Sequence, residues 1–227
     1  MKTKLVLTTT ASIVFSLLTY AQQETKAYIS VEFGYGYRTA SAADNITDEL
    51  RDYNDELRSG FNIDTHLGVF IKPNWGLGLT YNRFQSNNQI RFLTPIIIEG
   101  LSVSSASDRV RINFIAPEFL YRSLSVNEKH SFISTLSIGY LSSKNDATIN
   151  DESLELSGGT IGLGLGFSYS YHITKSVAIG AGISFITGTL SKVEISNGIL
   201  TETVTLPDDE KENLSRININ GGIRFFL

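Results

Sequence analysis

Residues 160–172, which read TIGLGLGFSYSYH, alternate a small residue with an apolar or aromatic one along their whole length. A period of two predicts a β-strand, because successive side chains of a strand point to opposite faces. Glycine at every second position is unusual in a strand, since it offers no side chain to pack. We therefore expect the two faces of this strand to meet different surroundings.

The same alternation recurs along the chain and predicts eight strands of similar length. We place them at residues 27–38, 60–72, 75–86, 108–122, 131–142, 159–172, 177–190 and 213–227. Pro117 interrupts the fourth strand and predicts a bulge there, because proline cannot donate a ladder hydrogen bond.

Short and long connections alternate between these strands. The short ones fall near 73–74, 123–130 and 173–176, and the long polar ones are residues 39–59, 87–107, 143–158 and 191–212. An even number of antiparallel strands, with short turns on one side and long loops on the other, is typical of a transmembrane β-barrel. We therefore predict an all-β fold: an eight-stranded antiparallel transmembrane β-barrel with short periplasmic turns and four long extracellular loops.

The two faces of the predicted strands fit this fold. One face of the first strand is apolar, as at Ile29, Val31 and Phe33, and the other is small or polar, as at Ser30 and Glu32. Eight strands enclose a lumen only wide enough for side chains. We therefore place the small and polar face inside the barrel and the apolar face against lipid.

Charged residues of both signs occupy predicted inward positions. The predicted polar network of the lumen comprises Glu32, Asp64, His66, Arg111, Glu118, Arg216 and Arg224. The first and last strands must be neighbours in a closed barrel, and we align Tyr28 with Leu227 across that seam.

This alignment brings Glu32 close to Arg224. Charges buried in so narrow a lumen must pair, because leaving one of them uncompensated is costly. We predict an ion pair between Glu32 and Arg224, with His66 or Glu118 as a third member.

Aromatic side chains cluster at the two ends of the predicted strands. The predicted girdles comprise Tyr35 and Tyr37 at one level, and Trp75, Tyr121, Tyr169 and Tyr171 at the other. Aromatic girdles at both interfaces are a feature of membrane barrels. The alternative, aromatic residues scattered over a soluble sheet, does not explain their grouping at strand ends.

The N-terminus reads as a processing signal. Lys2 and Lys4 precede a mostly apolar run over residues 5–18, and Ala21 offers a small residue for cleavage. This pattern predicts a secretory signal peptide over residues 1–21 and a barrel domain over residues 22–227. An uncleaved membrane anchor is the alternative, but a mostly apolar run of fourteen residues is shorter than the ~20 residues that a spanning helix needs.

Composition excludes several classes of function. The formal net charge is −4, which argues against a nucleic-acid partner, since such proteins carry a basic stripe. The sequence holds no cysteine, which excludes disulfides, thiolate zinc sites and a cysteine nucleophile. Acidic stretches at 145–155 and 206–213 lack a fixed ligand spacing, so we expect solvated carboxylates rather than a calcium site. We therefore expect no cofactor and no metal.

The C-terminus carries the most specific pattern. Alternate positions counted back from the last residue form a predicted assembly signature: Ile219, Gly221, Ile223, Phe225 and Leu227. This ending resembles the signature that outer-membrane barrels present to their assembly machinery, although members of that family most often end in phenylalanine.

The mature chain as a whole resembles the small eight-stranded outer-membrane proteins, the group of OmpX, OmpW and the transmembrane domain of OmpA. The resemblance covers architecture and the terminal signature. It implies export through the secretory pathway to the outer membrane of a Gram-negative cell. It also implies contact with the barrel assembly machinery, outer-membrane lipid and lipopolysaccharide.

Catalysis is not expected. A few barrels of this size act on lipid A through a Ser-His-acid set near one rim. His130 and His172 fall at the short-turn end of their strands, and His66 faces inward at mid-strand. We interpret His66 as a hydrogen-bonded member of the lumen network.

One long connection holds a helical pattern. Within residues 45–58, Leu50, Tyr53 and Leu57 fall on one helical face, which predicts a short helix packed over the barrel mouth. The alternative is a mobile loop.

Two functional classes fit the predicted barrel. The first is a non-enzymatic structural or surface-interaction protein, with side chains closing the lumen and the loops at 39–59, 87–107, 143–158 and 191–212 meeting an extracellular partner. The second is a narrow channel for small or apolar solutes, in the manner of OmpW. Paired inward charges favour the first, and the glycine-lined sixth and seventh strands keep the second open.

Overall fold

The computed structural model describes residues 27–39, 48–98, 101–150, 152–208 and 211–227. The predicted signal peptide, residues 1–21, lies outside the described residues. No helix among the described residues is long and apolar enough to cross a membrane.

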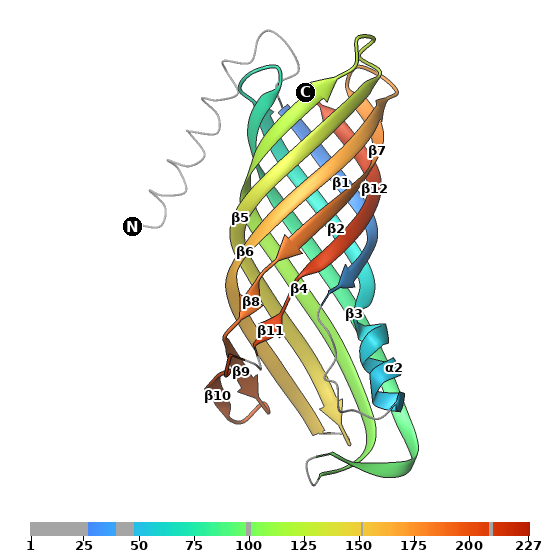
Figure 1. Ribbon diagram of the computed structural model, residues 1–227, viewed down its shortest axis with the longest axis vertical. Helices are drawn as coiled ribbons and strands as arrows, with labels where there is room; N and C mark the ends of the chain where they lie inside the picture. Colours follow the sequence, from blue (N-terminus) through green and yellow to red (C-terminus); the bar gives the residue numbers. More distant parts are fainter. Residues whose placement is uncertain (1–26, 40–47, 99–100, 151, 209–210) are drawn as a thin grey trace.

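Eight strands form a closed ring. They are β1 (Ala27–Arg38), β2 (Ser59–Phe70), β3 (Trp75–Ile98), β4 (Leu101–Leu124), β5 (His130–Ile149), β6 (Glu152–His172), β7 (Val177–Thr187) and β12 (Arg216–Phe226). Each strand pairs antiparallel with the next, and β12 pairs with both β7 and β1. The predicted all-β, eight-stranded antiparallel barrel is therefore confirmed (Figure 1).

The two ends of the ring differ. Tight connections at 71–74, 125–129 and 173–176 lie at one end. The first and last described residues meet there, since Leu227 N donates to Ala27 O at 2.8 Å and Ala27 N donates to Leu227 O at 3.2 Å. We call this the periplasmic end, after the predicted position of the short turns, and the opposite one the mouth.

The walls of the barrel have unequal height. Strands β3 to β6 contain 20 to 24 residues, about twice the 11 or 12 of β1, β2, β7 and β12. The predicted loops at 87–107 and 143–158 are therefore wrong, because most of these residues continue the strands as two tall hairpins (Figure 1). Asn150, with φ of 50°, occupies the tight turn between β5 and β6.

Shorter elements complete the mouth. The predicted helix is present as α2 (Asp48–Leu57), where Tyr53 and Leu57 are buried and Leu50 is partly buried. The last connection holds β8 (Thr189–Leu190), β9 (Lys192–Ser196), β10 (Thr201–Thr205) and β11 (Glu212–Asn213). Strand β8 pairs with β11, and β9 pairs with β10 and with β6.

Pro117 causes no bulge. Its position pairs with Leu79 of β3 without a change of register. On the β5 side, the pairs of Ile115 with Tyr140 and of Glu118 with Ser137 keep one offset, and only the two ladder positions between them lack partners. The strand accommodates proline by omitting ladder pairs, so the bulge prediction is wrong.

Candidate functional site

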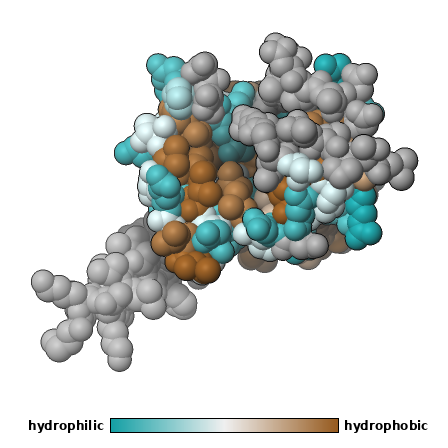
Figure 2. Space-filling model, turned by 90° about the horizontal axis from the view of Figure 1, so that it is seen from below, coloured by the Kyte–Doolittle hydropathy of each residue, from teal (hydrophilic) through white to brown (hydrophobic). Residues whose placement is uncertain are grey.

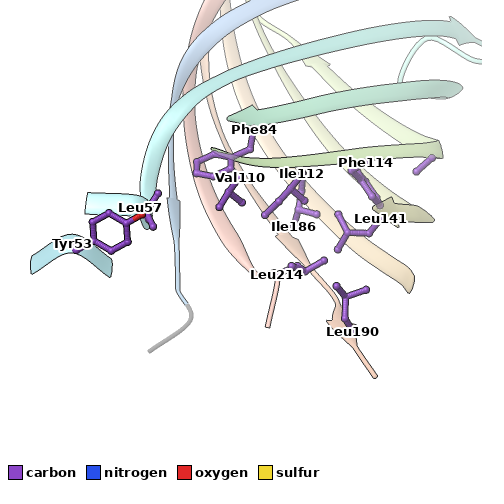
Figure 3. Packing of buried hydrophobic residues seen from close by; sticks show 11 residues of the cluster. Tyr53, Leu57, Phe84, Val110, Ile112, Phe114, Leu141, Ile186, Leu190 and Leu214 are labelled. Carbon is purple, nitrogen blue, oxygen red and sulfur yellow. The ribbon is translucent and has the colours of Figure 1, made fainter. Parts of the chain in front are cut away.

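The inward face of the barrel carries the candidate functional residues. Alternate positions of each strand converge on the axis, and they form three layers along it. An apolar layer near the mouth comprises Tyr53, Leu57, Phe84, Val110, Ile112, Phe114, Ala116, Leu141, Ile186, Leu190 and Leu214 (Figure 3). A second apolar layer at the periplasmic end comprises Tyr28, Phe70, Leu120, Ile133, Ala178 and Phe226. Between them lies a belt of polar and charged side chains, which we call the polar belt.

Glu32 and Arg224 meet in the polar belt. Arg224 donates to Glu32 Oε1 from Nη2 at 2.6 Å and from Nε at 3.1 Å, and Ser30 Oγ donates to the same oxygen at 2.7 Å. Arg224 Nη1 also donates to Tyr169 O at 3.0 Å. Both charged side chains are buried, so the pair is shielded from solvent.

The seam that holds this pair differs by one residue from the predicted alignment. Tyr28 pairs with Phe226, not Leu227, and Glu32 pairs with Gly222. Directly opposed residues of an antiparallel pair share a face, so an inward residue must oppose another inward one. Tyr28 is buried and Leu227 is exposed, which makes the predicted alignment impossible.

His66 belongs to a second group in the belt. Its Nδ1 lies 2.9 Å from Glu118 Oε2, and its Nε2 lies 3.3 Å from Asp64 Oδ1. Among the contacts found for the described residues, neither His66 nor Glu118 bonds to the Glu32–Arg224 pair. The Glu32–Arg224 pair and the group of His66 with its two carboxylates are therefore separate, rather than one three-membered cluster.

Arg216 is the most buried cation of the belt. Its side chain is fully buried, and Nη2 donates to Asn82 Oδ1 at 2.6 Å. Its Nε and Nη1 find no hydrogen-bond partner among the described residues. Asn62 and Asn220 lie in the same belt and bond to each other at 2.9 Å.

Arg111 does not belong to the lumen, so this part of the predicted network is wrong. It lies between the buried Val110 and Ile112 and points outward, where it pairs with Asp146. A bulge at Pro117 would have put Arg111 and Glu118 on one face. Without the bulge, a separation of seven residues puts them on opposite faces.

Glycines on the inward face make room for this packing. A Cβ added to Gly36 would lie 2.7 Å from the Phe84 ring, and one added to Gly162 would lie 3.2 Å from the Phe114 ring. A Cβ on Gly180 would lie 2.5 Å from Arg224 Nη1. The small face of the chain is therefore matched to bulky side chains from other strands.

The outward face is apolar over most of the ring. The predicted girdle residues Tyr35, Tyr37, Trp75, Tyr121, Tyr169 and Tyr171 are all exposed. The rings of Trp75 and Tyr121 lie 5.0 Å apart at the periplasmic end. Of the predicted assembly signature, the large apolar members Ile219, Ile223 and Phe225 face outward on β12, and Leu227 lies just past its end.

The remaining histidines lie at the periplasmic end, as the sequence indicates. His130 Nδ1 lies 2.7 Å from the hydroxyl of Tyr169, and His172 Nε2 lies 2.9 Å from Ser131 Oγ. Within the described part of the chain, no group of three or more His, Asp or Glu side chains could hold a metal ion.

A bowl lies above the mouth-side apolar layer. This cavity of about 430 Å³ is bordered by α2, by the inner face of β4 to β6, and by the segment from β8 to β11. Asp108, which lines this cavity, accepts a 2.5 Å hydrogen bond at Oδ2 from the hydroxyl of Tyr53. Burial and the adjacent Asp108 carboxylate raise the pKa of Tyr53 well above its usual value.

Comparisons with known proteins agree on the architecture. The model of a family described as the outer membrane protein beta-barrel domain matches residues 7–225. No curated protein matches the chain.

Solved structures show the same fold at low sequence identity. Neisserial surface protein A is 14% identical, with a TM-score of 0.53, over 88% of this chain and 97% of that one. OprG from Pseudomonas aeruginosa is 12% identical, with a TM-score of 0.52, over 90% and 97%. The outer membrane protease OmpT from Escherichia coli is 8% identical, with a TM-score of 0.50, over 89% and 97%.

Proposed function

The chain belongs to the family of outer-membrane β-barrel domains, and from this membership we propose that it is a non-enzymatic structural or surface-interaction barrel whose lumen is closed to solutes. The family places the protein in the outer membrane of a Gram-negative cell. Export by a signal peptide over residues 1–21, assembly through the barrel machinery, and contact with lipid and lipopolysaccharide are parts of the same proposal.

The layered packing of the lumen carries the proposal. Phe84 and Phe114, exposed by 0% and 1%, are buried in the layer near the mouth, and Tyr28 and Phe226, each exposed by 2%, are buried in the layer at the other end. Between these layers, the two cavities that border the charged groups measure only about 30 and 20 Å³. Such spaces hold one or two water molecules and no larger solute.

The contacts of the three histidines support a non-enzymatic role. His66 is held between two carboxylates inside the polar belt, and its side chain is only 15% exposed. His130 and His172 bond to neighbouring strand residues at the periplasmic end. The fold shared with a protease is compatible with this proposal, since one fold hosts many functions.

A narrow channel is the alternative function. One observation favours it: the small cavities in the belt lie along the glycine-rich wall of β6 and β7, at Gly164, Gly166 and Gly182. A wall without side chains leaves space that only water or the opposite wall can fill. Movement of the apolar layers would connect these cavities.

Single-channel recording in a planar lipid bilayer separates the two functions. We expect no steady openings from the wild type. The double substitution Phe84→Ala and Phe114→Ala removes the two strand-borne rings of the mouth-side layer, and we expect it to increase ion leak.

The matched control is Phe61→Ala with Phe119→Ala, which removes two rings from the outward face of β2 and β4. We expect this control variant to give no steady channel openings, like the wild type. Steady openings of the wild type would overturn the closed lumen and favour the channel.

A further inference from the structure

The periplasmic end of the barrel contains a hollow of about 500 Å³. It lies between the turn that joins β4 to β5 and the turn that joins β6 to β7, beside the end of β12. Its lining combines the cations Arg122, Lys129 and Lys175 with one acidic residue among the described residues, Glu128. The hollow therefore has an excess of positive charge in a chain whose formal net charge is −4.

The two lysines of this hollow have no carboxylate partner among the described residues. Lys129 and Lys175 are both exposed, and neither takes part in an ion pair found in this part of the chain. Arg122 contributes charge, but its Nε and Nη2 donate to Pro73 O at 3.3 and 3.0 Å. The ammonium groups of the two lysines are therefore available to an anion from outside the protein.

Hydrogen bonds position the turns that carry the two lysines. Asn127 Oδ1 accepts from the backbone N–H of Lys129 at 3.1 Å, and Thr174 Oγ1 accepts from the backbone N–H of Ser176 at 3.2 Å. The backbone N–H of His172 also donates to Lys129 O at 2.9 Å and thereby joins the two turns. The hollow is therefore formed by the protein alone, and a preformed site lowers the entropic cost of binding.

The hollow lies close to the aromatic girdle of the periplasmic end. Tyr171 of this girdle is followed by Ile173, which is exposed, and two residues later by Lys175. Ile71 and Val126 are exposed in the other two turns. Because the girdles of membrane barrels lie at the interface with water, lysines just beyond a girdle lie among lipid headgroups.

Charge is distributed differently at the opposite end of the barrel. Helix α2, at the mouth, contains five acidic residues and one arginine. Figure 2, which views the molecule from the mouth, shows hydrophilic residues around the border of this end. Each of the three tight turns at the periplasmic end instead contains a lysine: Lys72, Lys129 and Lys175. The periplasmic turns are therefore suited to a negatively charged surface, and helix α2 is not.

We propose that the hollow binds the headgroup of an anionic phospholipid, such as phosphatidylglycerol, from the periplasmic leaflet of the outer membrane. The phosphate accepts hydrogen bonds from Lys129 and Lys175, and the charge of Arg122 adds to the attraction. The acyl chains lie along Ile173 and the apolar outer face of the barrel, which a soluble anion leaves uncovered. This site rests on the proposed location in the outer membrane, but it does not depend on whether the lumen conducts.

The test uses the full barrel in lipid nanodiscs and follows its backbone amide signals by NMR. The nanodiscs contain phosphatidylcholine with an increasing fraction of phosphatidylglycerol. We expect the signals of Lys129, Ile173 and Lys175 to shift as that fraction rises, and the shifts to become smaller at high salt, which screens exposed charges. The signals of Lys192 and Lys211, at the mouth, are the internal control and are expected to stay unchanged.

Further probes separate the sources of the anion. Inorganic phosphate and glycerophosphoglycerol, the water-soluble headgroup, lack acyl chains, so each is expected to cause weaker shifts in phosphatidylcholine nanodiscs at the same total concentration. Equal shifts with either probe would overturn the lipid assignment. Shifts caused by soluble peptidoglycan fragments but not by phosphatidylglycerol would indicate a cell-wall ligand and would also overturn it.

Variants assign the preference to the two lysines. Spin-labelled phosphatidylglycerol and phosphatidylcholine give the ratio of the affinities of the barrel for the two lipids. Replacement of Lys129 and Lys175 by glutamine is expected to reduce this ratio by about fivefold for each lysine. The matched control, Lys192→Gln with Lys211→Gln, removes the same charge from the mouth and should keep the wild-type ratio.

Gel mobility before and after heating confirms that each variant is a closed barrel. A folded wild type with equal affinity for both lipids would overturn the headgroup site and leave the proposed barrel standing. Retention of the wild-type ratio by the folded Lys129→Gln, Lys175→Gln variant would do the same. Failure of the wild type to form a heat-modifiable barrel in lipid would instead contradict the proposed function.

Discussion

At the scale of single residues, the contact between Glu32 and Arg224 connects the sequence pattern to the packed lumen. Alternation alone put both residues on the inward face, and closure of the ring made their strands neighbours. The predicted register was one position in error because it opposed the inward Tyr28 to the outward Leu227. Contacts across the lumen between strands that are not adjacent, such as that of Arg216 on β12 with Asn82 on β3, depend on the stagger between strands. No local sequence pattern contains this stagger.

A double-mutant cycle measures this pair. Glu32→Gln and Arg224→Gln alone should each lower the free energy of unfolding by roughly 3–5 kcal/mol, because each leaves a buried charge without its partner. The double variant should lose much less than the sum. Urea unfolding in lipid vesicles gives the three values.

The exposed pair of Asp55 and Arg58, 3.1 Å apart on α2, serves as the control. The same cycle there should give a coupling of about 0–1 kcal/mol. A coupling near zero for Glu32 and Arg224 would contradict their contact in the folded barrel.

At the scale of elements, the sequence predicted strands best where their two faces differ. Along the lipid-facing part of each strand, one face is apolar and the other small or polar. Toward the tips of β4 and β5, both faces carry polar residues, and toward the tip of β3 apolar residues occupy consecutive positions from Ile96 to Ile98. Val103 and Ala147 are buried there, but Val103 lies between Ser102 and Ser104, and Ala147 lies between Asp146 and Thr148. The difference between the two faces therefore disappears, and the sequence pattern of these strand tips resembles that of a loop.

The same change of surroundings explains the error at Arg111. Near the mouth the lumen becomes apolar, as at Ile112 and Phe114, and the outer face carries the charged pair of Arg111 and Asp146. A rule that places apolar residues outside and charged residues inside is inverted at this level. The helix α2 was predictable because its apolar residues have a helical spacing that does not depend on the barrel.

The docking of α2 should depend on pH. The ordinary pKa of tyrosine is 10.0, and that of Tyr53 is raised by burial and by Asp108. The folded state therefore favours the neutral phenol, and its contribution to docking is full below pH 10 and is lost as the pH rises above it. Methyl signals of Leu57, followed through an alkaline titration in nanodiscs, should report release of the helix.

Tyr53→Phe is the control for this titration. It removes the ionisable group and the hydrogen bond to Asp108 but keeps the ring in the apolar layer. The Leu57 signals of this variant should stay constant over the same range of pH. An alkaline transition that persists in Tyr53→Phe would show that another group releases the helix.

At the scale of the whole molecule, the ring of strands must close for the protein to be stable in a membrane. Strand β12 seals the barrel by pairing with β1 and β7, and an open sheet edge does not survive in lipid. Phe225→Asp puts a charge on the lipid face of this strand, within the predicted assembly signature. We expect the variant to accumulate outside the outer membrane.

Membrane fractionation and gel mobility before and after heating measure this outcome. Phe225→Leu, which keeps an apolar side chain at the same position, should insert as the wild type does. Normal insertion of Phe225→Asp would mean that the end of β12 neither guides assembly nor limits closure.

Because its walls have unequal height, the barrel is not symmetric about its own axis. Strand β3 has 12 residues more than β1, or about 40 Å of extra strand at ~3.3 Å per residue. At the ~40° tilt of barrel strands this adds about 30 Å of height, roughly the thickness of the hydrocarbon core itself. The protein therefore has a tall side and a low side, and spinning about its own axis changes which of them a neighbouring protein in the crowded bilayer encounters.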